Sequence, residues 1–395
     1  MAIDEVLKLD FSSYPIIDHH CHPWSDSTTE ITKEFFINLM NMGGLSPEEA
    51  KDPENVIHSE FTPMGRQILH LMAKFLGCQP RLGEVIEARN KRARADYWQY
   101  SAELLLDARI EGLFVDDGYS EVSVGAGLAK NNFQEFEDKV SVPIRRVARI
   151  EPRFQTAVDE SKDFDDFVAR FDRSIDDAAK KDQAIAFKSV IAYRSGLHIG
   201  RPTDQQVLED YKRSKATRAR DVKHIRDWYV RRVISKCPEL GTTFHIHAGM
   251  GDIDVVFDKS NPMQLYGLLH DPETWKTKVF LIHGGYPFSQ EAAFYANALK
   301  NVYVDLSEMI PFASVPGAIE KTTHILDMAP PARVVFGSDG VVIPEIHWAG
   351  AKIGRQVIEE SLSAFVRTGV YDDDEAHQAA KMILAENARR VYKPW

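Results

Sequence analysis

The chain has 395 residues, a net charge of −11 at neutral pH and 44% hydrophobic residues. These values are typical of a folded globular protein and exclude a chain that is mainly disordered. The acidic balance argues against a dedicated nucleic-acid binder and against a protein that attaches to anionic membranes.

The cysteines and the N-terminal residues predict a cytoplasmic protein. The three cysteines, Cys21, Cys78 and Cys237, form no pattern, so we expect no disulfide framework. The N-terminus lacks the basic region and apolar run of a signal peptide. No stretch approaches the roughly 18 consecutive apolar residues of a transmembrane helix. We expect the partner to be a small-molecule substrate.

Eight short apolar runs rich in β-branched residues predict β-strands. They are Ile16–Cys21, Leu113–Asp116, Val147–Ile150, Ile185–Ile191, Thr243–Ala248, Val279–Gly284, Val302–Leu306 and Val334–Gly337. Most of the gaps between them have room for one helix, and strands that alternate with helices form a parallel sheet. Eight such units predict an α/β fold, a (β/α)8 TIM barrel that occupies residues 1–395 as a single domain.

One gap is too long for a single helix. Residues 25–110, between the first two strands, contain amphipathic patterns at 65–75 and 96–108 that are interrupted by prolines. We interpret this segment as a helical insertion that covers the C-terminal mouth of the barrel as a lid. A separate N-terminal helical domain is the alternative. The insertion is favoured because His20 and His22 precede the segment and need the barrel.

The most informative motif is Asp18-His19-His20-Cys21-His22, at the end of the first predicted strand. Alternate residues of a strand share a face, so His20 and His22 point the same way and could bind one metal ion. In barrels of this type the active site lies at the C-terminal ends of the strands.

Residues of the same chemical kinds end other predicted strands. They are Lys188, His245 with His247, His283 and Asp339. Neutral imidazoles and a carboxylate suit Zn²⁺ or another divalent ion such as Mn²⁺. A single buried histidine is more often a core residue, but that explanation does not account for the whole ordered set.

The motifs FKSVIAYRSGL, HIHAGMGD, FLIHGGYPF, NVYVDLSE and FGSDG resemble the amidohydrolase superfamily, in its amidohydrolase-related branch. In particular they are similar to the amidohydrolase domain of nodulin/glutamine-synthetase-like fusion proteins, although no glutamine-synthetase part follows in this sequence. The resemblance implies a metal-dependent hydrolase of C–N bonds and covers essentially the whole chain.

The resemblance also implies roles for single residues. His20 and His22 would hold the first ion, and Asp339 would bind the same ion and accept a proton from its water. His247 would be the ligand of the fifth strand, with His245 one layer deeper. His283 would bind a second ion or polarise the substrate carbonyl.

The number of ions depends on Lys188. In some family members the lysine of the fourth strand carries a carbamate that bridges two ions, and in others the site holds one ion. The carbamate is chemically reasonable, because a free ammonium would be repelled by two cations. The alternative is a buried ion pair with Asp18 or Asp339.

Several charged residues outside this set have weaker assignments. Arg194 could clamp a substrate carboxylate or order a loop. We expect Arg149 to pair with Glu151. Glu308 and His347 follow strands seven and eight and could reach the mouth, but we expect them to lie on the surface. The basic segment 212–232 is interpreted as a solvated helix that pairs with the acidic segment 159–177, with anion or partner binding as the alternative.

The leading hypothesis is a metal-dependent hydrolase that cleaves an amide-type C–N bond in a small, carboxylated substrate. A decarboxylase, a hydratase or a sugar-acid isomerase on the same site is the second hypothesis. A non-catalytic regulatory protein that keeps its metal is the third. A homodimer is expected from the habit of the family.

Overall fold

The computed structural model describes residues 9–40, 49, 52–118, 121–124, 127–130, 133–217 and 222–393. Eight parallel strands form one sheet in the order β1-β2-β5-β6-β7-β8-β9-β11. They are β1 (Ile16–Cys21), β2 (Ile110–Asp116), β5 (Ile144–Arg149), β6 (Ala186–Ser189), β7 (Thr243–His247), β8 (Val279–Ile282), β9 (Val302–Asp305) and β11 (Val334–Val335). All eight predicted strands are present.

The sheet closes on itself between its first and last strands. The His19 N–H donates to the Phe336 carbonyl at 3.0 Å, and the Asp339 N–H donates to the His20 carbonyl at 2.8 Å. The predicted (β/α)8 barrel is therefore confirmed, and these bonds hold the chain after β11 directly against the histidines of β1.

Several predicted strands are too long at their carboxyl ends, including the fourth and the eighth. The fourth strand ends at Ser189, because Ile191–Tyr193 turns into a short 3-10 helix. The eighth strand has two residues, since the chain after Val335 leaves the sheet. In both places the strand ends before the residues that line the mouth.

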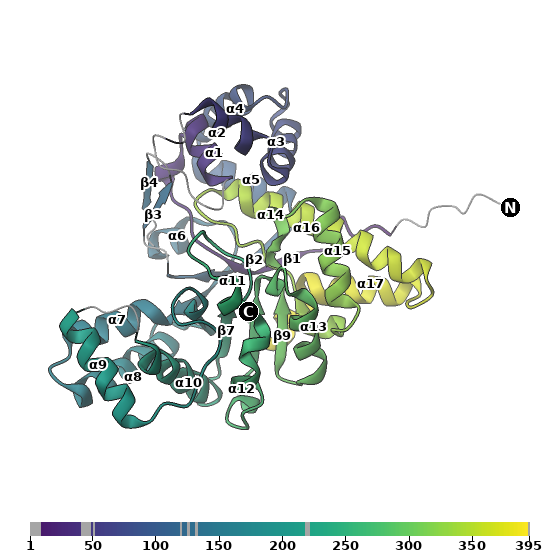
Figure 1. Ribbon diagram of the computed structural model, residues 1–395. Helices are drawn as coiled ribbons and strands as arrows, with labels where there is room; N and C mark the ends of the chain where they lie inside the picture. Colours follow the sequence, from purple (N-terminus) through teal and green to yellow (C-terminus); the bar gives the residue numbers. More distant parts are fainter. Residues whose placement is uncertain are drawn as a thin grey trace.

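Helices surround the strands (Figure 1). They are α6 (Phe133–Lys139), α7 (Ile150–Glu160), α8 (Phe164–Lys180), α9 (Asp204–Thr217), α10 (Lys223–Leu240), α11 (Phe257–Ser260), α12 (Tyr266–Leu269), α13 (Ser289–Ala298), α14 (Met309–Phe312), α15 (Val315–Leu326), α16 (Pro344–Arg367), α17 (Asp373–Lys381) and α18 (Asn387–Tyr392). Amphipathic α8 illustrates the pattern, because Phe167, Phe171 and Ile175 recur every four residues and are buried. None of the helices in the described residues is both long and apolar enough to span a membrane.

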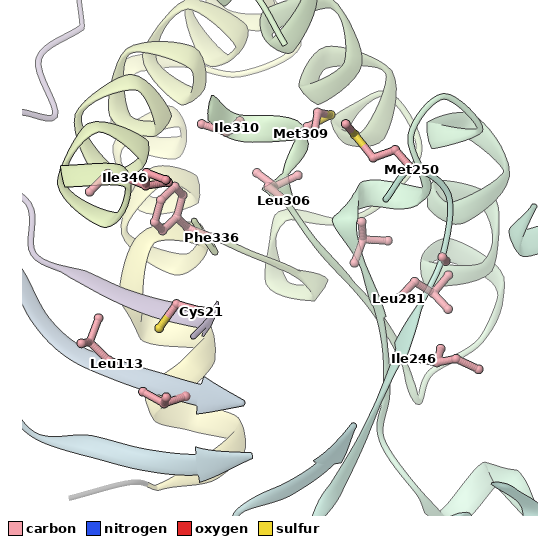
Figure 2. Packing of buried hydrophobic residues seen from close by; sticks show 14 of the residues in the cluster. Cys21, Leu113, Ile246, Met250, Leu281, Leu306, Met309, Ile310, Phe336 and Ile346 are labelled. Carbon is pink, nitrogen blue, oxygen red and sulfur yellow. The ribbon is translucent and has the colours of Figure 1, made fainter. Parts of the chain in front are cut away.

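The apolar layer between strands and helices positions the histidines. Cys21, Leu113, Ile246 and Leu281 belong to the buried apolar cluster that Figure 2 shows. Because neighbouring residues of a strand face opposite ways, packing Ile246 outward turns His247 into the barrel. Slipping β7 by one residue would reverse both of its faces. In β1 the register is irregular between Asp18 and Cys21, and His19 and His20 both face inward.

The segment between β1 and β2 is helical, and most of it lies within the described residues. Its helices are α1 (Lys33–Leu39), α2 (Pro53–Glu60), α3 (Pro63–Leu76), α4 (Leu82–Ala95) and α5 (Tyr97–Asp107), which lie together near α14 and α16 (Figure 1). Buried side chains of α3, such as Ile68 and Met72, belong to the same apolar cluster as the barrel helices. A short hairpin after β2, β3 (Glu121–Val124) with β4 (Gly127–Lys130), was not predicted.

A buried ion pair ties this insertion to the barrel. The Arg89 Nε of α4 donates to Glu345 Oε1 of α16 at 2.6 Å, and both side chains are 0% exposed. The Tyr100 hydroxyl of α5 donates to the same oxygen at 2.9 Å. The two helices are thus fixed on the first turn of α16, which follows the Asp339 loop.

We expect Glu345→Gln to destabilise the protein by about 3–5 kcal/mol, because it leaves the Arg89 guanidinium buried without a counter-charge. Urea unfolding measures the loss. The control is Glu84→Gln, which removes the partner of Arg81 in a pair where Arg81 is 76% exposed. That change should cost at most about 1 kcal/mol. Equal effects of the two variants would contradict this role of Glu345.

Candidate metal centre

Three predicted ligands converge at the C-terminal end of the barrel. His20 Nε2 and His22 Nε2 each lie 3.3 Å from Asp339 Oδ1. Tetrahedral zinc with bonds of about 2.0–2.1 Å separates its ligand atoms by about 3.3 Å. The spacing of this triad therefore matches a metal site.

The electrostatics of the triad also fit a cation. Burial, followed by the positive charge of Lys188, lowers the pKa of His20 well below its usual value. The ring is therefore neutral and keeps a lone pair to donate. Asp339 Oδ1 is buried and has no hydrogen-bond partner among the described residues. The Asp339 backbone has a φ of 54°, a strained conformation of the kind found at functional sites.

A second group lies beside the triad. One ligand atom each from His247, His283 and Glu308 falls within 4.8 Å of the others. The rings of His247 and His283 are 4.3 Å apart, and the rings of His20 and His283 are 5.4 Å apart. The two groups therefore occupy one mouth, with His283 between them.

The hydrogen bond of His247 fixes its tautomer. Its Nε2 lies 2.6 Å from the Met250 carbonyl oxygen, which can only accept, so Nε2 carries the proton. The Nδ1 lone pair then remains for a ligand. Burial is the largest cause that lowers the pKa of His247 and of His283 well below the usual value, so both rings are neutral.

Lys188 lies inside this cluster. Its Nζ is 3.0 Å from His20 Nε2, and among the described residues it forms no ion pair with Asp18 or Asp339. Asp18 instead accepts from the N–H and hydroxyl of Ser338. Burial lowers the pKa of Lys188 to about 8, and the attraction of Asp116 offsets this effect only in part.

His245 lies one layer deeper than His247. Its Nε2 is 2.7 Å from the Tyr392 hydroxyl, which is also 2.7 Å from His19 Nε2. His19 Nδ1 in turn lies 2.8 Å from Asp305 Oδ2. His245 therefore belongs to a polar network in the barrel interior and not to either group at the mouth.

Three expectations about polar residues are wrong. Glu308 and His347 are buried, 5% and 0% exposed, where surface positions were expected. Arg149 pairs bidentately with Asp116 instead of Glu151, and Glu151 accepts from the Ser189 hydroxyl and the Val190 N–H. The reason is that β5 ends at Arg149 and a helix begins at Ile150, so the two side chains do not share a strand face.

Glu308 is the site residue that sequence reasoning missed. It follows the carboxyl end of β9, the kind of position that pointed to Asp339 after β11. Burial, and next the negative charge of Asp339, raises the pKa of Glu308 well above its usual value. Its position after a strand was the signal that could have identified it as a site residue. That signal is weak, because two residues separate Glu308 from the end of β9.

A cavity of about 480 Å³ has one wall residue, Tyr193, in contact with a histidine of the metal cluster. Arg149, Arg194 and Arg226 line it together with Glu151, Asp252 and Asp254. Tyr193 also lines it, and its ring lies 4.6 Å from the ring of His247. Tyr193 is thus the link between the cavity and the ligands, and the cavity carries charged groups of both signs.

The predicted substrate residue Arg194 is on the wall of this cavity. Its Nη1 lies 3.7 Å from Asp254, and its side chain is 42% exposed. Arg226 comes from α10, inside the basic segment 212–232. Other cations of that segment pair with acidic groups as expected, for example Arg232 with Asp172. Residues 218–221 lie outside the described part of the chain.

The Asp116–Arg149 pair predicts a pH-dependent stability. Burial alone would raise the pKa of Asp116, but Arg149 outweighs it, so the pKa is lowered. Because the folded-state pKa of Asp116 is lowered, its ionised form stabilises the protein at any pH above the unfolded-state pKa of about 3.9. This stabilisation is lost as the pH falls through the folded-state pKa. Asp116→Asn should therefore destabilise strongly at pH 7, and the difference from wild type should shrink between pH 5 and pH 3. Urea unfolding across that range measures it, and a constant difference would contradict the assignment.

Comparison with known proteins places the chain in a family. Residues 17–393 match the family model described as Amidohydrolase. Protein fluG of Emericella nidulans is 31% identical over 245 residues, which are 58% of this chain and 28% of that protein. The chain therefore matches little more than a quarter of the length of this curated relative.

Solved structures show the same fold. A proposed metal-dependent hydrolase from Lactobacillus casei superposes with a TM-score of 0.83 at 20% identity, over 98% of each chain. Uronate isomerase from Thermotoga maritima gives a TM-score of 0.67 at 13% identity, over 96% of this chain and 95% of that one. The fold and the ligand groups define a metal-dependent barrel enzyme class. Because the family model covers nearly the whole chain, this protein belongs to the amidohydrolase family.

Proposed function

We propose that the protein hydrolyses an amide-type C–N bond in a small, carboxylated molecule. The observation that carries the proposal is the convergence of His20, His22 and Asp339, and the arginines of the cavity that Tyr193 links to His247 add to it. The ligand triad suits the activation of water, and the arginines suit an anionic substrate. Membership of the amidohydrolase family supports the same reaction class.

His20, His22 and Asp339 would hold a Zn²⁺ or Mn²⁺ ion, and His247 and His283 would serve a second ion. A divalent ion bound there lowers the pKa of water and polarises a carbonyl. Asp339 accepts the proton of the attacking water and passes it to the leaving nitrogen. His283, when it is not engaged as a ligand, donates a hydrogen bond to the carbonyl oxygen as negative charge develops there.

Lys188 is proposed to carry a carbamate that bridges the two ions. Carbamylation requires a neutral amine, and burial brings the pKa of Lys188 to about 8, so part of the population is neutral at physiological pH. The change from ammonium to carbamate also converts a repelled cation into an anion beside the ions. Mass spectrometry under native conditions tests for the added CO₂.

The substrate carboxylate is proposed to bind between Arg194 and Arg226. Guanidinium groups bind carboxylates bidentately, and two of them from different elements fix the orientation of the ligand. Both side chains line the cavity next to the metal cluster.

The decisive experiment is a hydrolysis screen of the Zn²⁺- or Mn²⁺-loaded protein over N-acyl and γ-glutamyl amides, with uncharged amides of equal size as controls. Release of the amine from carboxylated substrates is expected. Arg194→Gln should raise KM with little change in kcat. If the protein hydrolyses only uncharged amides, the proposed substrate class is wrong. If it hydrolyses no amide but converts sugar acids, the proposed reaction is wrong.

A sugar-acid isomerase on the same residues is the second candidate. The fold likeness to uronate isomerase over nearly the whole chain favours it, and it would use the same arginines for the carboxylate. A decarboxylase or hydratase would need no change in the ligand set. A purely regulatory protein is less well supported, because it has no need of a buried, unpartnered Asp339 oxygen.

We infer a homodimeric, cytoplasmic enzyme whose insertion, residues 25–110, closes over the mouth. Its partner is the small-molecule substrate, with no nucleic acid and no membrane.

A further inference from the structure

We propose that Glu308 is the carboxylate ligand of a second metal site, which it forms with His247 and His283. The inference rests on the proposed metal-dependent activity and adds to it a ligand from the seventh barrel strand. It assigns an anionic partner to the second ion independently of the state of Lys188.

The geometry of Glu308 supports this role. Its Oε2 lies 3.3 Å from His283 Nδ1, and His247 completes a group whose ligand atoms fall within 4.8 Å of one another. The hydrogen bond of His247 Nε2 to Met250 leaves Nδ1 to donate its lone pair. Two imidazoles and one carboxylate form a common ligand set for Zn²⁺.

Burial disfavours the charged form of the Glu308 side chain, and a bound cation would stabilise that form. Its side chain is 6% exposed, and Oε2 has no hydrogen-bond partner in the described part of the chain. A carboxylate removed from water without donors is strongly unfavourable. The Nζ of Lys188, the lysine of the centre, lies 3.0 Å from His20 Nε2, and no ion pair between Lys188 and Glu308 is formed among the described residues.

The backbone gives a second, independent observation. Glu308 has a φ of 59° and a ψ of −54°, a strained conformation for a residue with a side chain. The Ser307 N–H donates to Asp305 Oδ1 at 2.8 Å, and residues 307 and 308 bridge to 310 and 311, which holds the turn in place. Such strain persists where it aims a functional side chain, and here it turns the carboxylate toward His283.

The charges of the two groups then match. His20 and His22 share the Asp339 carboxylate, and His247 and His283 share the Glu308 carboxylate. Each group thus offers two imidazoles and one carboxyl group to a divalent ion. A carbamate on Lys188 would add to this balance, but the second site does not depend on it.

The test counts metal ions. Chelator-treated protein is titrated with Zn²⁺ alone, and bound metal per chain is measured by elemental analysis after gel filtration. Wild type is expected to take two ions. Glu308→Gln is expected to take one, with the affinity of the second site reduced by at least about 100-fold. Glu308→Asp, which keeps the charge on a shorter arm, should lie between them.

The matched control is Glu151→Gln. Glu151 is a half-buried carboxyl whose Oε1 accepts two hydrogen bonds, and it belongs to none of the candidate ligand groups, so both ions should be retained. Circular dichroism checks that each variant is folded. If Glu308→Gln does not fold, the metal content of Glu308→Asp tests the proposal instead. Three results would each overturn the proposal. Both Glu308 variants could bind two ions with unchanged affinity, or Glu308→Gln could lose both ions. The third result is a wild type that never binds more than one ion. Amide hydrolysis by a one-ion wild type would leave the proposed function standing.

Discussion

The double variant His20→Ala/His22→Ala is expected to lose the ion of the first site while the barrel stays folded. Both imidazoles lie 3.3 Å from Asp339 Oδ1, so the pair supplies two of the three donors of that site. One remaining carboxylate does not bind a divalent ion tightly in water. The fold does not depend on the rings, because the apolar layer around Cys21 and Leu113 packs on the other face of the strands.

Elemental analysis of metal per chain and thermal unfolding, measured on the same sample, test this result. The control is His70→Ala/His270→Ala, which removes two exposed imidazoles and should leave the metal content unchanged. Full occupancy in the His20/His22 variant would refute the assignment of the first site. Unfolding of that variant would show that the rings are structural residues.

The strands and the metal ligands on them were predictable because both follow from one rule. A parallel strand buried on both faces is a continuous apolar run, and the polar residues that interrupt it at its carboxyl end face the mouth. His20, His22, Lys188 and His247 obey this rule, whereas His19 and His245 lie in the polar network of the barrel interior. The choice of His247 over His245 came from the family resemblance, and the structure places His245 against Tyr392.

The failures occur where the strand ends. Alternation predicts which way a side chain points only while the backbone remains extended. The Arg149–Glu151 pair was expected on one face, but the chain becomes helical at Ile150. Glu308 was missed because its positive φ reverses the chain after β9, and no count of residues along a strand foresees such a turn.

Contacts between segments far apart in the sequence were also beyond prediction. Arg226 reaches the cavity from α10, and Glu345 meets Arg89 from a helix 256 residues away along the chain. Charge and periodicity identify such residues as cations or anions on a helix. Only the packing of the helices around the barrel decides which of them face a neighbour and which face the mouth.

The variant Asp339→Asn is expected to keep much of its metal and lose about 10²- to 10⁴-fold in kcat, the contribution typical of a general acid–base group. The amide oxygen still offers a lone pair to the ion, but it cannot take up the proton of the attacking water. The position is otherwise preserved, because the Asp339 N–H is held by the His20 carbonyl whatever the side chain.

Metal content and kcat measured on one preparation separate the two roles of Asp339. If the residue were a ligand alone, activity would fall only as far as the metal content, and added Zn²⁺ would restore it. If it is also the base, the loss persists at full occupancy. Asp258→Asn, an exposed carboxylate on α11 outside the cavity, is the matched control and should retain wild-type activity. A fully loaded Asp339→Asn within twofold of the wild-type rate would show that the proton goes elsewhere, and Glu308, the other buried carboxyl of the mouth, would be the next group to examine.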